Sequence, residues 1–573
     1  MSIEQSYKLW LENAVEDSDL TNELISIKEN NEEIYDRFYK ELSFGTAGLR
    51  GVIGAGTNRM NIYTVRRTTQ GLANYINETS DNNKSVAISY DSRIKAQTFA
   101  KEAACVLAAN GIKVYLVAEL QPTPVLSFAV RSFHCSAGIM ITASHNPAKY
   151  NGYKCYGPDG CQMTDNSANA VYTQIQSIDI FTGCKTMDFD KALSEGLIEY
   201  IGEDLYENYL SQVEKQAVNK DVCKDSNLKV VYTPLNGTGN KLVRKILSRI
   251  GISEVSIVKE QEYPDGNFPT CPYPNPEIKE ALELALKLAE KENPDIVLAT
   301  DPDCDRVGIA VKDNNKNYQL LTGNEVGILL INYILSCRTK LGNLPKKPVA
   351  VKTIVSSDMV DLIARKYDCE LRTVLTGFKY IGEQILNLEK ENESERYVFG
   401  FEESYGYLVG TYVRDKDAVV ASMLICEMAA YYRKQGKTLL DVLSELYDEY
   451  GYYKNQTLSF SFEGAAGMEK MKNIMDSLRA NPINELLDMR VTGIADYSQS
   501  TFTDTTSRLT LMIKLPKSNV IEYKLENGNS AIIRPSGTEP KIKLYITSVG
   551  NSMENAIKLN NDIAECLKKI LNI

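Results

Sequence analysis

The sequence predicts an α/β protein made of three similar α/β domains with mixed or parallel sheets and a smaller C-terminal α+β domain. Three times along the chain, apolar strands alternate with helical segments, and the last strand of each set ends in a loop rich in reactive side chains. This alternation is typical of sheets covered by helices. Beyond about residue 455, short strands of alternating polarity indicate antiparallel pairing. A chain of 573 residues is too long to form a single hydrophobic core, and its length fits about four domains.

We place the domain boundaries where these patterns change. The N-terminal helices and the first α/β domain take residues 1–205, the second α/β domain 206–322, the third 323–453, and the α+β domain 454–573. Residues 5–42 are charged, favour helix and contain the only tryptophan, Trp10, so we expect helices that lie against the first domain.

The first α/β domain ends in a candidate phosphate-carrying loop. Its predicted strands are Val86–Tyr90, Lys113–Val117 and Gly138–Ile141, and the last leads into Thr142-Ala143-Ser144-His145-Asn146-Pro147. We expect Ser144 to be exposed at the sheet edge, where its small neighbours let a phosphate approach. A simple polar turn is the alternative. His145 is a hydrogen-bonding support, a base or a passive loop residue.

The second α/β domain ends in three alternating carboxylates. Its predicted strands are Lys229–Tyr232, Val255–Val258 and Ile296–Ala299, and the last leads into Asp301-Pro302-Asp303-Cys304-Asp305-Arg306. In an extended chain these acids would point the same way. They would repel each other without a cation, and oxygen ligands without His or Cys suggest Mg²⁺. A solvated acidic turn is the alternative.

The acidic loop is not an EF-hand. Counted from Asp301, the sixth position is Arg306 instead of glycine, and the twelfth is Lys312 instead of glutamate.

The third α/β domain ends in the loop Gly400-Phe401-Glu402-Glu403-Ser404. Its predicted strands are Val349–Lys352, Leu371–Val374 and Tyr397–Phe399. Gly377–Tyr380 and Arg414–Asp417 supply further cations, which solvated charge runs explain equally well.

The C-terminal domain carries a candidate phosphate clamp. Alternating strands are predicted around Leu458–Phe462, Leu509–Ile513 and Ile542–Ile546, with a last helix from about Met553 to Leu571. Arg534–Pro540 offers a guanidinium, two hydroxyls and a flexible glycine, which together suit a phosphate. A tight turn between strands is the alternative.

Composition excludes several classes of function. The net charge of −11 argues against non-specific binding to nucleic acid or anionic membranes. The 12 cysteines form no C-x-x-C pair, and the two histidines, His134 and His145, are too few for a zinc site with several His. The N-terminus lacks the pattern of a signal peptide, and the most apolar stretch, Val419–Ile425, is interrupted by Glu427 and too short to span a bilayer. We expect a cytoplasmic protein.

Five loops, taken in order, resemble the α-D-phosphohexomutases, the phosphoglucomutase/phosphomannomutase family. They are Gly45–Gly51, Thr142–Pro147, Asp301–Arg306, Gly400–Tyr407 and Arg534–Pro540. The resemblance spans nearly the whole chain, and T-A-S-H-N-P, D-P-D-x-D-R and R-P-S-G-T-E-P in this order are very specific. The motif G-T-A-G-L-R-G and the length of the chain look most like those of the phosphoglucomutase-2/phosphopentomutase branch. The resemblance implies four domains around a central cleft.

The resemblance also implies a role for each matching residue. Ser144 would be the phosphoserine, and Asp301, Asp303 and Asp305 would hold Mg²⁺ together with the Ser144 phosphate. Lys416 corresponds to the family's candidate general acid/base, and His145 to its histidine. The other matches would bind substrate: Arg50, Arg306 and Lys379 as a cationic lining, Glu402 and Ser404 at the sugar hydroxyls, and Arg534, Ser536, Gly537 and Thr538 at the non-reacting phosphate.

The implied activity is that of an isomerase that exchanges glucose 1-phosphate and glucose 6-phosphate through a phosphoserine and a hexose 1,6-bisphosphate, with glucose 1,6-bisphosphate as activator. The loop Glu402-Glu403-Ser404 resembles the glucose type. Phosphopentomutase, phosphomannomutase and hexose-bisphosphate synthase activities remain alternatives. The expected partners are small sugar phosphates, and the chain is expected to be a monomer or homodimer.

Two other classes of protein compete with this interpretation. Haloacid-dehalogenase-type enzymes also place D-x-D after an apolar strand, but that reading leaves Ser144 without a role. A sugar-phosphate-binding protein without catalysis would not need the full set of chemical residues.

Overall fold

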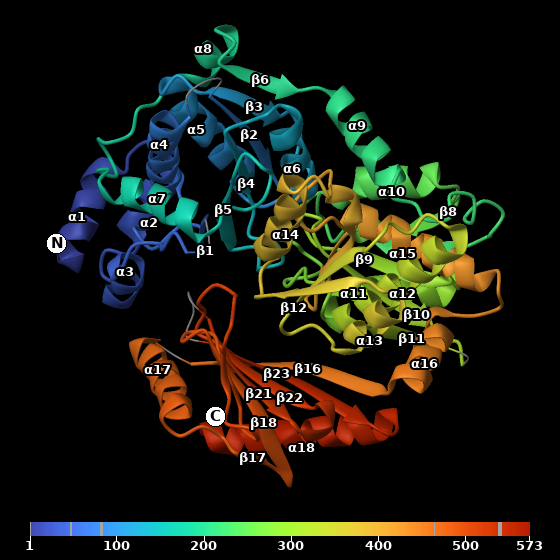
Figure 1. The fold of residues 1–573 in the computed structure, drawn as a ribbon. Helices are drawn as coiled ribbons and strands as arrows, with labels where there is room; N and C mark the ends of the chain where they lie inside the picture. The colour runs from blue at the N-terminus through green and yellow to red at the C-terminus, as the bar shows by residue number, and fades with distance from the viewer. Residues whose placement is uncertain (1, 46–47, 81–83, 314, 463, 537–540) are drawn as a thin grey trace. The chain divides into compact units, whose positions relative to one another are not determined.

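The computed structural model describes residues 2–45, 48–80, 84–313, 315–462, 464–536 and 541–573. The chain forms two compact units (Figure 1). The first unit comprises Met1–Gly323 and Phe378–Thr438, and the second comprises Asn324–Gly377 and Leu439–Ile573.

The first unit begins with three short helices that pack around Trp10. They are α1 (Ile3–Asn13), α2 (Ser18–Ser26) and α3 (Asn31–Phe38). The Trp10 side chain is 1% exposed. Its ring meets Phe38, Tyr63 and Phe181 edge-on, with centroid separations of 5.9, 5.8 and 5.4 Å. Because Tyr63 and Phe181 belong to the first α/β domain, the predicted docking of the N-terminal helices is confirmed.

A six-stranded mixed sheet follows, in the order β1-β5-β4-β2-β3-β6. Its strands are β1 (Gly48–Val52), β2 (Ser85–Tyr90), β3 (Lys113–Val117), β4 (Ala137–Ile141), β5 (Tyr150–Tyr156) and β6 (Ile198–Ile201). Its helices are α4 (Ile62–Thr79), α5 (Ala96–Ala109), α6 (Thr123–Ser132), α7 (Asp165–Gln176), α8 (Phe189–Ser194) and α9 (Glu203–Glu214). Strands β2, β3, β4 and β6 pair in parallel, whereas β5 runs antiparallel to both β4 and β1.

A five-stranded sheet has the order β11-β10-β9-β7-β8. Its strands are β7 (Lys229–Thr233), β8 (Glu254–Ile257), β9 (Ile296–Thr300), β10 (Val307–Lys312) and β11 (Tyr318–Leu321). The helices α10 (Gly239–Arg249) and α11 (Lys279–Glu292) and the 3₁₀ turn Lys259–Gln261 connect the parallel strands. Strand β10 returns antiparallel to β9, so the sheet is mixed.

The rest of the first unit surrounds a short antiparallel pair, β14 (Tyr397–Glu402) and β15 (Gly406–Leu408). Its helices are α14 (Phe378–Lys390) and α15 (Ala418–Arg433), with a 3₁₀ turn at Ser394–Arg396. Glu427 interrupts the apolar stretch but does not end α15: its buried carboxylate accepts hydrogen bonds from the backbone N–H groups of Val218 and Asn219. None of the described helices is long and apolar enough to cross a membrane.

The second unit contains the parallel pair β12 (Val349–Thr353) and β13 (Glu370–Val374) and the C-terminal sheet. Almost all of α12 (Gly323–Leu341), together with α13 (Met359–Lys366) and α16 (Leu439–Tyr450), precedes that sheet along the chain. The later elements are β16 (Tyr452–Ser461), α17 (Gly464–Ala480), β17 (Glu485–Leu486), β18 (Met489–Asp496), β19 (Thr501–Asp504), β20 (Thr510–Met512), β21 (Ile521–Leu525), the 3₁₀ turn Glu526–Gly528, β22 (Ser530–Pro535), β23 (Lys541–Gly550) and α18 (Met553–Leu571).

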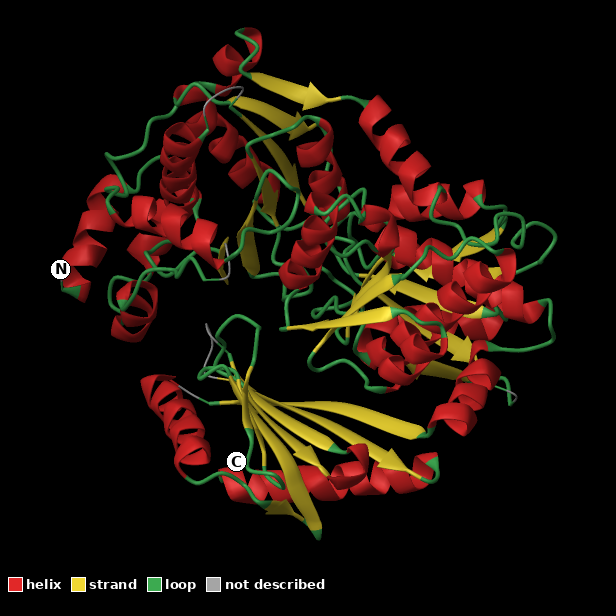
Figure 2. Ribbon diagram, viewed as in Figure 1, coloured by secondary structure: helices red, strands yellow, loops and turns green. Residues whose placement is uncertain are grey.

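The C-terminal sheet is antiparallel, and α17 and α18 supply its apolar cover (Figure 2). Residues such as Leu478, Ile533 and Leu567 share one buried core cluster. The predicted α+β domain and the helix from Met553 to Leu571 are therefore confirmed, as is the predicted α/β class with mixed sheets. The residue boundaries of the four domains stay a prediction.

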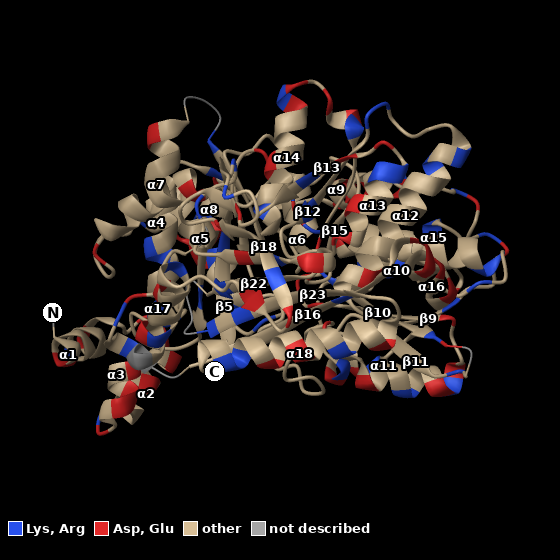
Figure 3. Ribbon diagram, turned by 60° about the horizontal axis from the view of Figure 1, so that its bottom comes forward, with Lys and Arg blue, Asp and Glu red and all other residues tan. Residues whose placement is uncertain are grey.

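Basic and acidic positions are interspersed along the described helices (Figure 3). On α11 and α18, lysines alternate with aspartates and glutamates over a few residues. Such mixing of the two signs suits a solvated surface.

Candidate active site

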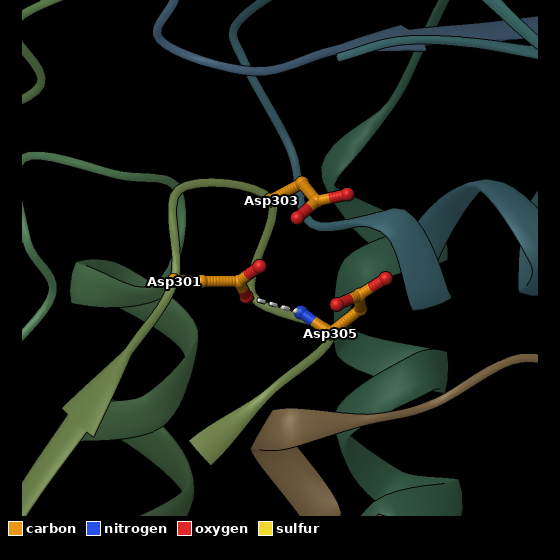
Figure 4. A group of neighbouring side chains, drawn as sticks. All are labelled: Asp301, Asp303 and Asp305. Atoms are coloured by element: carbon orange, nitrogen blue, oxygen red, sulfur yellow. Dashed lines mark hydrogen bonds between the residues drawn. The ribbon is translucent and has the colours of Figure 1, made fainter. Parts of the chain in front are cut away.

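The three aspartates converge because the chain turns sharply after β9. The backbone reverses at Cys304, which has a φ of 52°, and returns as β10. One carboxylate oxygen of Asp301, Oδ1, accepts a hydrogen bond from the backbone N–H of Asp305 at 3.1 Å (Figure 4). The same oxygen accepts a second hydrogen bond from the N–H of Arg306 at 3.0 Å. The predicted convergence is present, but an extended strand is the wrong reason for it. One oxygen from each of Asp301, Asp303 and Asp305 lies within 4.8 Å of the others, and all three side chains are buried.

Burial and neighbouring charges move the pKa values of Asp301 and Asp303 in opposite directions. Burial, followed by the charges of Asp303 and Asp305, raises the pKa of Asp301 well above its usual range. Burial also acts to raise the pKa of Asp303, but the Lys154 ammonium, 2.9 Å from its Oδ2, together with Asp301 and Lys416 outweighs burial and lowers that pKa. A dication between the carboxylates would relieve the same repulsion.

The donor set fits Mg²⁺. The buried Oδ1 atoms of Asp303 and Asp305 have no hydrogen-bond partner among the described residues. Buried carboxylate oxygens are costly to leave unpaired, and hard oxygen ligands are those that Mg²⁺ prefers. Asp301, Asp303 and Asp305 are therefore the residues that would hold the ion.

Ser144 lies directly against this cluster. It follows β4 with a φ of 51°, in the left-handed region. Its Oγ donates to Oδ2 of Asp301 at 2.7 Å and lies 3.2 Å from Nδ1 of His145. Contrary to the prediction of an exposed serine, Ser144 is only 3% exposed. The hydroxyl is thus buried against the carboxylate of Asp301 instead of facing solvent.

Arg93 holds the Ser144 loop and was missed in the sequence. Its buried guanidinium donates to the backbone carbonyls of Ser144, Asn146, Pro147 and Tyr150. Four acceptors along one loop explain how the unfavourable φ of Ser144 is maintained. The available signal was the D-S-R run directly after the carboxyl end of β2, where ligand sites collect in parallel sheets.

Three further contacts complete this support. The Arg93 guanidinium lies over the ring of Phe268, 5.2 Å from its centroid. Thr142 Oγ1 donates to Asp91 Oδ2 at 2.6 Å and accepts from the N–H of Ser144 at 2.7 Å. The loop is therefore anchored on both sides of the serine.

Two lysines neutralise the acidic cluster. Lys416 Nζ lies 3.2 Å from Asp305 Oδ2 and 3.2 Å from Asp415 Oδ1. Burial acts to lower the pKa of Lys416, but Asp305 and Asp415 outweigh it and raise that pKa, so the side chain is an ammonium at neutral pH. Lys154, also missed in the sequence, lies on β5 between Asp303 and Asp305, 2.9 and 3.6 Å from their Oδ2 atoms. A lysine within an otherwise buried strand was the signal for it.

The expected cationic lining has existing partners. Arg306 pairs with Glu277, and Lys379 Nζ lies 2.6 Å from Asp165 Oδ1. Arg50 donates to Asn146 Oδ1, in the Ser144 loop, at 3.4 Å. Arg306 and Arg50 thus belong to the surroundings of Ser144, since both also lower the pKa of His145.

The sugar-loop residues lie at the turn between β14 and β15. Glu402 is the last residue of β14 and is buried, and its charge acts to raise the pKa of both Lys416 and Arg306. Ser404 is half-buried in the turn. Glu402 therefore shares the electrostatic environment of the aspartate cluster.

The candidate phosphate clamp belongs to the second unit. Arg534 is half-buried on β22, opposite Lys543 of β23, and the N–H of Ser536 donates to the Lys541 carbonyl at 2.7 Å. Gly537 and Thr538 lie outside the described residues. Their predicted contact with a phosphate stays a prediction.

The chain matches three protein-family models. Three models named phosphoglucomutase/phosphomannomutase, alpha/beta/alpha domains I, II and III, match residues 41–180, 207–315 and 322–450. The chain belongs to the phosphoglucomutase/phosphomannomutase family. It is therefore similar to isomerases of the phosphohexomutase type, as the resemblance of its five loops implied.

Individual members of the phosphoglucomutase/phosphomannomutase family agree in both sequence and fold. A phosphoglucomutase of Staphylococcus haemolyticus is 37% identical over 92% of this chain and 93% of its own length. A phosphoglucomutase of Staphylococcus aureus (strain bovine RF122 / ET3-1) is 37% identical over 94% of this chain and 95% of its own length. The open form of parafusin, a phosphoglucomutase from Paramecium, has the same fold with a TM-score of 0.66 at 17% identity, over 93% of this chain and 96% of its own. A phosphoglucomutase/phosphomannomutase family protein from Burkholderia thailandensis has the same fold with a TM-score of 0.65 at 18% identity, over 92% of this chain and 97% of its own.

Replacing Asp303 tests the metal site. Asp303→Asn removes one negative charge and one candidate ligand, so we expect Mg²⁺ affinity to fall at least about tenfold, together with turnover, while the circular dichroism spectrum stays unchanged. The measurement is turnover as a function of Mg²⁺ concentration. Asp221→Asn removes the same charge from a side chain that is 77% exposed and should change neither quantity. An unchanged Mg²⁺ dependence in Asp303→Asn would place the ion elsewhere.

The pKa of His145 gives a second test. Burial, followed by Arg306 and Arg50, lowers it well below the ordinary 6.5, so His145 is neutral at pH 7. As the pH falls, the imidazole of His145 takes up a proton in the unfolded chain before it does so in the folded protein. The stability contributed by neutral His145 is therefore complete above about pH 6.5 and is lost as the pH falls below that value. An NMR titration of the His134→Asn variant, which leaves His145 as the only histidine, should give a midpoint below 6.5. A midpoint at or above 6.5 contradicts the described environment.

Proposed function

We propose that this chain is a phosphoglucomutase that exchanges glucose 1-phosphate and glucose 6-phosphate through a phosphorylated Ser144. The observation that carries the proposal is the 2.7 Å contact between Ser144 Oγ and a carboxylate of the buried three-aspartate cluster. It brings a hydroxyl that can carry a phosphoryl group next to a site suited to Mg²⁺. The naming of relatives at 36–37% identity as phosphoglucomutases supports the choice of reaction.

The reaction consists of two phosphoryl transfers. In the first, the bond between phosphorus and Ser144 Oγ breaks, a bond forms to the free hydroxyl of the sugar phosphate, and the hydroxyl proton passes to a base. In the second, the bond between phosphorus and the other sugar oxygen breaks, the phosphoryl group passes to Ser144 Oγ as that hydroxyl loses its proton, and the released sugar oxygen takes up a proton. When bound, Mg²⁺ would supply positive charge beside the phosphoryl oxygens.

The protonation states divide the acid and base roles. Lys416 carries its proton at neutral pH and lies at the aspartate cluster, so it suits the donor of a proton or hydrogen bond to the transferring group. His145 is neutral, and its Nδ1 lies 3.2 Å from Ser144 Oγ, so it suits the acceptor when the serine attacks. Arg93 keeps the serine in place during both transfers.

Substrate binding is assigned to the remaining family-matching residues. Glu402 and Ser404 would contact the sugar hydroxyls, and the loop that begins at Arg534 and Ser536 would bind the phosphate that does not react. Glucose 1,6-bisphosphate would phosphorylate Ser144 and so activate the enzyme. The cytoplasmic location and a monomeric or homodimeric state stay predictions.

The identity of the sugar is tested by comparing substrates. Pentose phosphate, mannose phosphate and net synthesis of hexose bisphosphate use the same chemistry and stay alternatives. Side-by-side kcat/KM values for glucose 1-phosphate, mannose 1-phosphate and ribose 1-phosphate would decide between them. A higher value for ribose or mannose 1-phosphate would move the assignment to that sugar and leave the Ser144 chemistry intact.

Ser144→Ala should abolish almost all mutase activity, because it removes the atom that carries the phosphoryl group. Intact-mass and peptide mass spectrometry of the purified wild type should locate a phosphate on Ser144. Ser136→Ala changes a serine at the opposite end of β4 and should keep both phosphate and activity. Acid-labile phosphate on Asp301 would instead support the dehalogenase-type mechanism.

Arg534→Ala should mainly raise KM, since a clamp on the non-reacting phosphate binds substrate and transition state alike. Loss of a charge-assisted contact of this kind costs about 2–5 kcal/mol, or roughly 30- to several-thousand-fold in kcat/KM. Ser144 should still be phosphorylated by high concentrations of hexose 1,6-bisphosphate. Arg490→Ala, which changes an exposed arginine of the same domain, is the control. Wild-type KM and kcat in Arg534→Ala would show that this loop is only a turn between strands and does not bind the phosphate.

A further inference from the structure

Thr123 makes two hydrogen bonds to the metal-site aspartate Asp303. Its backbone N–H donates to the Asp303 carbonyl at 2.9 Å, and its Oγ1 donates to Asp303 Oδ2 at 2.9 Å. Thr123 is the first residue of α6, which packs on the six-stranded sheet, whereas Asp303 follows β9 of the five-stranded sheet. The aspartate is therefore held by a residue from another sheet.

These contacts leave one oxygen of Asp303 available. Oδ2 is occupied twice, by Thr123 Oγ1 and by Lys154 Nζ, each at 2.9 Å. Oδ1 is buried and has no hydrogen-bond partner among the residues that the structure describes. Because a carboxylate is planar, fixing Oδ2 also fixes the direction of Oδ1. The Asp303 carboxylate is thus oriented so that only Oδ1 can coordinate a cation.

Thr123 itself is held rigidly. Its exposed fraction is 0%. Prolines flank it on both sides, at Pro122 and Pro124, and their rings restrict the backbone at the start of α6. As a β-branched residue in a helix, threonine also has few side-chain rotamers. A hydroxyl held this firmly can orient the carboxylate that it contacts.

We propose that Thr123 is a positioning residue of the metal site, whose hydroxyl orients Asp303 so that Oδ1 faces the ion. The inference rests on the proposed function, because it assumes that the aspartate cluster binds Mg²⁺. Thr123 contributes no ligand and acts only through Asp303. Hydrogen-bonding partners of metal ligands typically change metal affinity by about 10- to 100-fold when removed.

A purely structural role would have different consequences. If Thr123 only joined the two sheets, its loss would lower the stability of the protein without a specific effect on metal affinity. Thr123→Val separates the two roles, because valine keeps the volume and branching and loses only the hydroxyl. Thr123→Ser restores the hydroxyl without the methyl group.

Thr69→Val is a matched control for the loss of a buried hydroxyl. Thr69 also has an exposed fraction of 0%, and its Oγ1 bonds to the Val65 carbonyl and lies 3.1 Å from the Tyr153 hydroxyl. None of these groups belongs to the aspartate cluster. Its removal should reduce stability and leave metal affinity unchanged.

The experiment measures Mn²⁺ binding to the full-length protein by electron paramagnetic resonance, with Mg²⁺ as competitor. We expect Thr123→Val to weaken Mn²⁺ binding by about 10- to 100-fold, Thr123→Ser to bind like the wild type, and Thr69→Val to bind like the wild type. Turnover of Thr123→Val should recover at saturating Mg²⁺, since the groups that transfer the phosphoryl remain.

Each contrary result has a distinct meaning. Unchanged Mn²⁺ affinity in Thr123→Val, or an equal loss in Thr123→Ser or Thr69→Val, overturns the positioning role alone. If the wild type binds no Mn²⁺ and Mg²⁺ does not affect its turnover, the metal assignment in the proposed function falls, and this inference falls with it.

Discussion

Three carboxylates of like charge are buried within 4.8 Å of one another, and much of the first unit serves to make that arrangement stable. Burial and the charges of Asp303 and Asp305 favour the protonated form of Asp301, whose pKa is raised. Lys154 and Lys416 supply opposite charge from β5 and from the segment before α15. Backbone N–H groups of the turn bind one oxygen of Asp301. Oδ1 of Asp303 and Oδ1 of Asp305 keep no hydrogen-bond partner among the described residues, and these two oxygens mark the candidate cation site.

The serine loop is adapted to the same cluster. Its backbone is bent into a left-handed conformation at Ser144, which a serine seldom adopts without support. Arg93 supplies that support through carbonyl groups, whereas the Ser144 hydroxyl contacts the carboxylate of Asp301 and the ring of His145. The phenyl ring of Phe268, from the segment between β8 and α11, covers the guanidinium. Support and chemistry are thus divided between different atoms of the loop.

The sequence was sufficient to predict the strands that lead into the site, because each is an apolar run that ends at a change to polar residues. Asp301, Asp303, Asp305 and Ser144 could be selected for the same reason. Arg93 and Lys154 left only weak local signals and Thr123 left none, since their importance depends on which strands lie side by side, and sequence periodicity does not contain that information. The exposure of Ser144 was also predicted wrongly: a polar side chain after a strand is expected at the surface unless its buried partner is known. The extended-chain argument for the aspartates failed because the turn at Cys304 is set by hydrogen bonds that no alternation pattern reveals.

Trp10 lies among Phe38, Tyr63 and Phe181, and it is the only tryptophan in the chain. Light absorbed selectively by indole is therefore absorbed at one place, where α1 meets α3 and the first α/β domain. The emission spectrum of this protein is consequently a local probe. It reports whether the N-terminal helices are docked on the first α/β domain. Because Trp10 lies among Phe38, Tyr63 and Phe181, an unchanged emission spectrum during catalysis would say nothing about the aspartate cluster.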